Sequence, residues 1–218
     1  MRILAVSDVH SPRYLSEFKR ALERCSKPDV FLFAGDMIDA GKLNEYNLVV
    51  DAILERFEER VPVVACLGNS EQKVTIQSLR ATVGEKMIFL DGETTTISTG
   101  DKSLGILGAP IVDISNNKQD RSIEEVFESR IQLMAHQLGQ LNQTCDHSIL
   151  LLHYSPLSVD TFPESFSWWV SRTFEEAQPD LVIHGHIHYA TKAETLVDKT
   201  RVFNVALPSA KKITEILI

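Results

Sequence analysis

The chain has 218 residues, of which 44% are hydrophobic and 24% are charged, and this composition is typical of a globular protein. Its length predicts one domain over residues 1–218. The 22 Lys and Arg residues are outnumbered by 30 Asp and Glu residues, which gives a net charge of -8. This acidic balance argues against non-specific binding to nucleic acids or anionic membranes, because both surfaces repel negative charge.

The cysteines and the apolar runs indicate the compartment. Cys25, Cys66 and Cys145 are scattered and odd in number, and no C-x-x-C pair occurs. No apolar run reaches the roughly 18 residues that a membrane-spanning helix needs, and the apolar stretch at residues 3–6 is too short for a secretory leader. We therefore expect a reduced, cytoplasmic protein that does not bind membranes.

Short apolar runs alternate with longer segments that carry apolar residues at helical spacing, which predicts an α/β protein. In the first third of the chain, we expect strands over residues 2–7, 30–34 and 63–67, with amphipathic helices over residues 14–25 and 43–60 between them. The strands are nearly continuously apolar, as expected when both faces of a sheet are buried.

The middle of the chain has short apolar pieces over residues 87–90, 94–98 and 104–107, separated by Asp91-Gly92 and Thr99-Gly100-Asp101. These turn residues predict a β-meander with hairpin turns. Further along, we expect an amphipathic helix over residues 123–141, buried strands over 149–152 and 181–183, and closing strands over 202–205 and 213–218.

Polar residues of metal-binding types follow each of the five buried strands. They are Asp8-Val9-His10, Gly35-Asp36-Met37-Ile38-Asp39, Gly68-Asn69-Ser70-Glu71, His153, and His184-Gly185-His186-Ile187-His188. Because ligands of α/β sheets bind beyond the carboxyl ends of the strands, we expect these segments to meet at one edge. Asp, Asn and His without Cys form a ligand set that suits Mn, Fe, Zn or Ni.

The spacing within these segments predicts their local geometry. Asp8 and His10 are two residues apart, as are His186 and His188, so an extended backbone would point both members of a pair the same way. A glycine comes directly before a candidate ligand in three of the segments, where the chain must turn sharply and approach a ligand closely. These glycines are Gly35, Gly68 and Gly185.

The ordered series D-x-H, G-D-x-x-D, G-N-x-E, a lone His after a strand, and G-H-x-H resembles the calcineurin-like metallophosphoesterase superfamily, from Asp8 to His188. The resemblance implies a two-sheet β-sandwich flanked by helices, in four α/β/β/α layers, with two divalent metal ions at its edge. Mn²⁺ is the expected metal, with Fe, Ni or Zn as alternatives. It also implies the ligands: Asp8, His10 and His188 for one metal, Asn69, His153 and His186 for the other, and Asp36 as the bridge. Asp36, Asn69 and His153 are the candidate catalytic residues among them.

The same resemblance implies hydrolysis of a small phosphoester or nucleotide by a hydroxide that bridges the two metals. Many members of the family have G-N-H-[DE], whereas this chain has Ser70 in place of that His. A hydroxyl cannot act as a general acid near neutral pH as an imidazole can, so we expect a phosphodiesterase rather than a phosphomonoesterase.

A weakly active or inactive metal-binding scaffold is the alternative function. The branch of the family in which another residue replaces this His includes small prokaryotic phosphodiesterases and also a retromer subunit that is mainly a binding scaffold. A decayed site is expected to have lost some of its metal ligands, whereas this chain has the full set, which favours the enzyme.

Several residues near these motifs have two interpretations. Asp39 either caps the following helix or orients a metal ligand or its loop. Ser70, which is not itself a predicted ligand, could also orient one. His184 alternates with His186 and is expected to form buried hydrogen bonds. Glu71 either ends the ligand loop or lies in the first turn of a helix. The segment 155–171, which follows Tyr154 and contains Phe162, Phe166, Trp168 and Trp169, covers the core, forms a wall of the substrate pocket, or contributes to a homo-oligomer contact.

Overall fold

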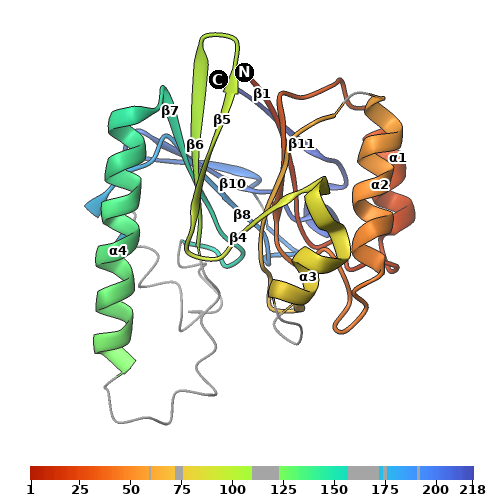
Figure 1. The fold of residues 1–218 in the computed structure, drawn as a ribbon, viewed down its shortest axis with the longest axis horizontal. Coiled ribbons are helices and arrows are strands. Elements are labelled where there is room, and N and C mark those ends of the chain that lie inside the picture. Colours follow the sequence, from red (N-terminus) through yellow and green to blue (C-terminus); the bar gives the residue numbers. More distant parts are fainter. Residues whose placement is uncertain (59, 72–75, 110–122, 157–171, 174–175, 191) are drawn as a thin grey trace.

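Two β-sheets packed face to face form the centre of the molecule, and helices cover both outer faces (Figure 1). The computed structural model describes residues 1–218 except 59, 72–75, 110–122, 157–171, 174–175 and 191. Within these residues, the first sheet has five strands in the order β11 (Thr214–Leu217), β1 (Arg2–Val6), β2 (Val30–Ala34), β3 (Val63–Cys66) and β4 (Ile88–Leu90). The second has six, in the order β5 (Thr94–Thr99), β6 (Lys102–Gly108), β7 (His147–Leu151), β8 (Leu181–His184), β10 (Thr200–Asn204) and β9 (Glu194–Val197).

The strands that precede the motifs run parallel within each sheet. In the first sheet, β1, β2, β3 and β4 pair in parallel, and β11 lies antiparallel to β1 with Leu217 opposite Arg2. In the second sheet, β6, β7, β8 and β10 pair in parallel, while β5 and β9 are antiparallel to β6 and β10. The carboxyl ends of the strands in each parallel set therefore face the same edge of their sheet.

The continuous apolar pattern of the central strands follows from burial on both faces. In β1, Ile3 and Ala5 pack between the two sheets, whereas Leu4 and Val6 pack under the helices of the first sheet. In β7, Ile149 packs between the sheets and Leu150 packs towards the helix on the far side. Three apolar layers thus separate four layers of secondary structure, which confirms the predicted α/β/β/α architecture.

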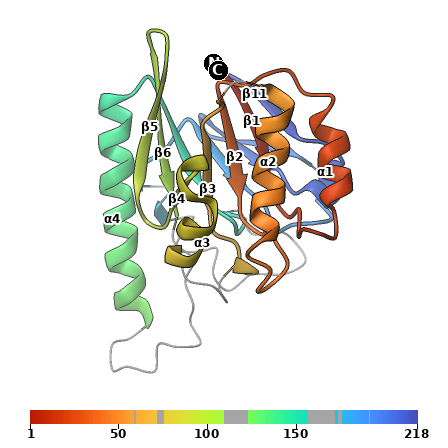
Figure 2. The ribbon, with the colours of Figure 1, turned by 45° about the vertical axis from the view of Figure 1, so that its right-hand side comes forward.

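The helices are divided between the two outer faces (Figure 2). The first sheet is covered by α1 (Leu15–Leu22), α2 (Glu45–Phe57) and α3 (Ile76–Val83), through buried residues such as Phe18, Ile53 and Leu79. The second sheet is covered by α4 (Ile123–Thr144), through Met134 and Leu138. Two shorter helical elements are the 3-10 turn η2 (Gly84–Lys86) and α6 (Leu207–Ala210). In the part of the chain that the structure describes, no helix combines the length and the apolar character needed to span a membrane.

The predicted β-meander is wrong. The hairpin β5–β6 forms as expected, with Thr99 opposite Lys102, but β4 pairs in parallel with β3 at the edge of the other sheet. Phe89 packs under the helices of that sheet, so the turn at Gly92 carries the chain from one sheet to the other. The strand β9 and the helices α3 and α6 were not predicted. All three are short, and β9 is a half-exposed edge strand without an apolar run.

Candidate metal centre

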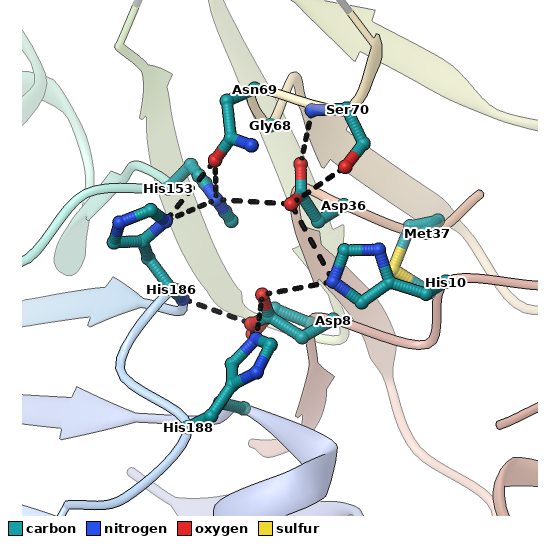
Figure 3. Close-up of polar contacts among 12 residues, drawn as sticks. Asp8, His10, Asp36, Met37, Gly68, Asn69, Ser70, His153, His186 and His188 are labelled. Carbon is teal, nitrogen blue, oxygen red and sulfur yellow. Dashed lines mark hydrogen bonds and ion pairs between the residues drawn. The ribbon is translucent and has the colours of Figure 1, made fainter. Parts of the chain in front are cut away.

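The loops that follow β1, β2, β3, β7 and β8 meet at one end of the sandwich, with contributions from both sheets (Figure 3). The two sheets are joined there by backbone contacts, because Ser7 pairs with Ala206 and the Ser7 N–H donates to the Val205 carbonyl at 3.1 Å. All seven side chains predicted as metal ligands lie at this end. They are Asp8, His10, Asp36, Asn69, His153, His186 and His188.

Asp8, His10 and His188 form the first group. Asp8 Oδ1 lies 2.9 Å from His188 Nε2 and 3.8 Å from His10 Nε2. The Asp8 carboxylate is fully buried, and its other oxygen accepts hydrogen bonds from Ser7 Oγ at 2.6 Å and from the His186 N–H at 2.9 Å. One carboxylate oxygen is thus held by the protein while the other faces two imidazole nitrogens.

Asn69, His153 and His186 form the second group. Asn69 Oδ1 lies 3.0 Å from His153 Nε2 and 3.1 Å from His186 Nδ1. The two ring nitrogens are 3.2 Å apart, so the three donor atoms form a compact triangle.

Asp36 lies between the two groups. Its Oδ2 is 3.6 Å from His10 Nε2 in the first group and 3.6 Å from His153 Nε2 in the second. This position suits a carboxylate that bridges two cations, and that role, which the family resemblance implied for Asp36, stays a prediction.

The chemistry of these donors fits divalent cations. His153 Nδ1 lies 2.9 Å from the Ala34 carbonyl oxygen, so this nitrogen donates its proton there and the lone pair of Nε2 points into the second group. That lone pair then faces Asn69 Oδ1, which also only accepts. Two acceptors at this separation repel unless a cation lies beside them, so the residues suit a bound metal.

The protonation states also suit metal binding. Burial raises the pKa of Asp8, but the hydrogen bond from His188, the nearby His153 and the hydrogen bonds from Ser7 and His186 outweigh it and lower the pKa to about 2. Burial lowers the pKa of His10, against the opposing effect of Asp36 and Asp8. The ionised carboxylate and the neutral imidazole are the forms that bind metal ions.

The expected extended backbone at the paired ligands is wrong. Asp8 has a φ of 58°, His10 of 43°, Asp36 of 53° and His186 of 68°, all in the left-handed region. Asp and His adopt this region more readily than most residues do, and such conformations concentrate at functional sites. The sharp turns bring the side chains inward at the strand ends, so the predicted convergence holds although the predicted backbone does not.

The three glycines lie where the protein leaves no room for a side chain, while their close approach to a bound ligand stays a prediction. A Cβ atom on Gly35, which has a φ of 81°, would lie 2.6 Å from the Gly68 backbone, and one on Gly185 would lie 2.6 Å from Asp8 Oδ2. On Gly68, it would lie 2.1 Å from Asp36 Oδ1. Any side chain at these positions would therefore displace a candidate ligand or its loop.

Gly68→Ala should weaken metal binding, because Asp36 Oδ1 and Asp36 N are both held by hydrogen bonds and cannot move freely from the added methyl group. We expect Mn²⁺ to bind about tenfold more weakly in a calorimetric titration, the size typical of disturbing the surroundings of a ligand. Gly139→Ala, in α4, is the control, since its added Cβ would have no atom within 4 Å beyond its chain neighbours and the adjoining helix backbone. Equal affinities in the two variants would contradict the expectation.

Glu71 directly follows the loop that carries Asn69 and lies in a 3-10 turn, in line with both interpretations, and its side chain has a further role that the sequence did not predict. Its fully buried carboxylate accepts backbone hydrogen bonds at Oε2 from Asp36 and Gly68, both at 2.8 Å, and at Oε1 from Met37 and Ile38, at 2.6 and 3.3 Å. Burial and the Asp36 carboxylate raise the pKa of Glu71 to about 8, and these N–H groups oppose the rise. Glu71 thus joins the loop that carries Asp36 to the loop that carries Asn69.

The expected capping role of Asp39 is wrong, because α2 begins six residues later at Glu45, after an N-cap residue Asn44 that forms no side-chain cap. Asp39 Oδ1 instead lies 3.7 Å from His10 Nδ1 and 3.2 Å from Arg13 Nη2, beside a candidate ligand. His184 is buried as expected, with Nδ1 3.0 Å from the Gly185 carbonyl oxygen.

Two residues that the sequence did not single out, Ser7 and Asn204, support the site, and Tyr154, an aromatic residue grouped with Phe162 and Trp168 in the sequence, also lies beside it. Ser7 is buried and donates to Asp8, and Asn204 Nδ2 donates to the Ile187 carbonyl at 2.8 Å, between His186 and His188. The Tyr154 ring packs edge-on against His186, with the ring centres 4.8 Å apart. Ser7 and Asn204 share the signal that marked the ligands, a polar residue at the end of a buried strand. The predicted roles of Phe162, Phe166, Trp168 and Trp169 lie outside the described residues.

Comparison with known proteins supports this geometry. A family model described as calcineurin-like phosphoesterase matches residues 1–190. The chain therefore belongs to the calcineurin-like phosphoesterase family, as its motifs predicted. No curated protein matches the chain.

Solved structures with the same fold share little sequence with this chain. TT1561 of Thermus thermophilus matches with a TM-score of 0.66 and 17% identity, over 98% of this chain and 97% of that one. GAP50, the anchor in the inner membrane complex of Plasmodium, matches with a TM-score of 0.66 and 13% identity, over 96% and 72%. The NAD nucleotidase of Haemophilus influenzae matches with a TM-score of 0.57 and 17% identity, over 98% and 54%. At these identities, the similarity establishes the fold alone.

Proposed function

We propose that this protein is a dinuclear metal-dependent phosphoesterase whose ligands are the seven residues predicted from the sequence. One observation carries the proposal: Asp36 Oδ2 lies at the same 3.6 Å from His10 Nε2 and from His153 Nε2, each of which belongs to a separate group of donors. A single carboxylate oxygen placed between two donor groups suits a pair of cations better than one cation.

Bound there, two divalent cations would lower the pKa of a coordinated water and neutralise charge on phosphoryl oxygens. The chain supplies the rest. Asp8 and Asp36 offset the positive charge, and the neutral imidazoles and the Asn69 amide add donors without further charge. The Ala34 carbonyl fixes the orientation of His153, as the hydrogen bonds from Ser7 and His186 fix Asp8.

The proposed substrates are phosphodiesters, or phosphate esters with acidic leaving groups, and among nucleotides the cyclic ones are phosphodiesters. Ser70 supports this preference, because the site offers no imidazole at that position to protonate a poor leaving group. Mn²⁺ is the proposed metal, since carboxylate, amide and imidazole donors suit it. The three free cysteines support a reducing, cytoplasmic location.

A screen of substrates and metals tests the proposal. Protein treated with a chelator would receive Mn²⁺, Ni²⁺, Zn²⁺ or Mg²⁺ separately, and would then be assayed on bis-p-nitrophenyl phosphate, p-nitrophenyl phosphate and nucleotide esters. We expect turnover that depends on added metal and is faster on the diester. A chain that binds two metal ions but hydrolyses none of these esters would be the alternative metal-binding scaffold instead.

Ser70→His should restore general acid catalysis and raise the rate on esters with poor leaving groups more than on esters with good ones. General acid help contributes about 10²–10⁴-fold, and at a site not built for an imidazole we expect the rate on poor leaving groups relative to good ones to rise by about tenfold. The measurement compares kcat/KM across a series of aryl and alkyl phosphodiesters. Equal effects across the series would mean that this position does not control protonation of the leaving group.

A further inference from the structure

Ser70 holds both oxygens of Asp36. Its main-chain N–H donates to Asp36 Oδ1 at 2.7 Å, and its hydroxyl donates to Asp36 Oδ2 at 2.9 Å (Figure 3). Oδ2 is the oxygen that lies between the two groups of candidate ligands. Rotation of a carboxylate about its last side-chain bond is soft, so the two hydrogen bonds from one residue decide which way the oxygens of Asp36 point.

The hydroxyl of Ser70 is already committed by this contact. A serine hydroxyl has one proton to donate, and an ionised carboxylate oxygen can only accept. The Ser70 proton therefore points at Asp36 and not at a leaving group. Many members of the family have a histidine at this position, whereas here the serine hydroxyl donates a hydrogen bond to the Asp36 carboxylate.

We propose that Ser70 is a positioning residue that directs the metal-facing oxygen of Asp36 and spreads part of its charge through a hydrogen bond. This inference rests on the proposed metal pair. Groups that hydrogen-bond to a metal ligand fix its orientation and adjust its strength as a donor, and their loss typically weakens metal binding about 10–100-fold.

The position of Ser70 does not depend on its hydroxyl. Glu71, the next residue, accepts hydrogen bonds from the N–H groups of Asp36 and Gly68, and the Ser70 N–H remains bound to Asp36 Oδ1. Main-chain N–H groups of each loop therefore donate to a carboxylate of the other: Asp36 N–H to Glu71, and Ser70 N–H to Asp36. Ser70→Ala removes one hydrogen bond and leaves the loops in place, which makes the substitution a clean test.

The experiment compares wild type with Ser70→Ala and Ser70→Thr. Each chelator-treated protein is titrated with Mn²⁺ by calorimetry, and electron paramagnetic resonance of the loaded proteins reports magnetic coupling within the Mn²⁺ pair. We expect about tenfold weaker binding and altered coupling in Ser70→Ala, with near wild-type values in Ser70→Thr, which keeps the hydroxyl. Ser98→Ala, at an exposed position on β5, is the control and should match wild type.

Three results would overturn the inference. Mn²⁺ affinity and coupling in Ser70→Ala equal to wild type would show that the hydroxyl does not act on Asp36. Weaker binding that threonine does not restore would show that the hydroxyl is not the group responsible. If wild-type protein binds Mn²⁺ but hydrolyses no ester, the proposed function is contradicted, and the titrations still test the role of Ser70. If wild-type protein binds no Mn²⁺, the proposed function and the role of Ser70 are both contradicted.

Discussion

Asp36→Ala should abolish tight binding of both metal ions together. Asp36 Oδ2 is equally close to an imidazole of each group, so loss of this side chain removes a ligand from both positions and leaves their positive charges facing each other. Loss of a group that merely supports a ligand costs about 10–100-fold in metal affinity, so loss of the bridge should cost more than that at both positions. Elemental analysis of the dialysed protein gives the number of ions bound per chain.

Asp8→Ala provides the comparison, because Asp8 Oδ1 contacts the His10 and His188 rings of the first group, whereas its other oxygen is bonded only to the main-chain N–H of His186 in the second. This variant should lose the metal at the first group and retain a weakened site at the second. Asp101→Asn, in the exposed turn between β5 and β6, should keep both ions. If Asp36→Ala retains two tightly bound ions, the assignment of Asp36 as the bridging ligand is contradicted.

The architecture and the positions of the candidate ligands can be predicted from the sequence for the same physical reason. Strands such as β1 and β7 are buried on both faces, so they appear as continuous apolar runs, and a polar residue directly after such a run marks a strand end. Asp8, Asp36 and His153 all have this signature. The parallel arrangement within each sheet then brings the strand ends to a common edge.

The pairing of strands and the backbone conformation of the loops cannot be predicted in the same way. The pairing of β4 with β3 depends on how Phe89 packs under distant helices, whereas the turn at Asp91-Gly92 suggested a local hairpin. The left-handed conformations of Asp8 and His10 are held by backbone hydrogen bonds to the loop at Gly35 and Asp36, at 3.1 and 3.0 Å. Such contacts join segments about 27 residues apart, and residue spacing within one motif contains no information about them.

Glu71 illustrates the same limit most clearly. The sequence placed it next to a ligand, but both interpretations considered only its local neighbours. In the fold, three of its four hydrogen-bond donors come from residues 36–38, on a different loop. The role of a buried carboxylate is set by the donors that the tertiary structure brings to it.

Replacing Glu71 should destabilise the protein more than any substitution of an exposed acidic residue. In Glu71→Ala, four N–H groups in the buried loops lose their acceptor, and each buried donor left without a partner costs about 1–3 kcal/mol. Entry of water into the space left by the side chain offsets part of this sum. We therefore expect the free energy of unfolding to fall by about 4 kcal/mol, near the upper end for single substitutions. In Glu71→Gln the free energy of unfolding should fall by less, because the amide oxygen still accepts from two donors while the NH₂ group faces the other two.

Urea unfolding in the presence of a chelator measures this loss without a contribution from bound metal, which would otherwise stabilise the folded state. Glu55→Gln is the matched control, since Glu55 is exposed on α2 and its substitution should change the free energy of unfolding by no more than about 0.5 kcal/mol. The order expected is wild type and Glu55→Gln together, then Glu71→Gln, then Glu71→Ala. If Glu71→Gln unfolds at the same urea concentration as wild type, the hydrogen bonds to this carboxylate contribute little, and the two loops must be held together by the packing of Met37 and Ile38 in the core.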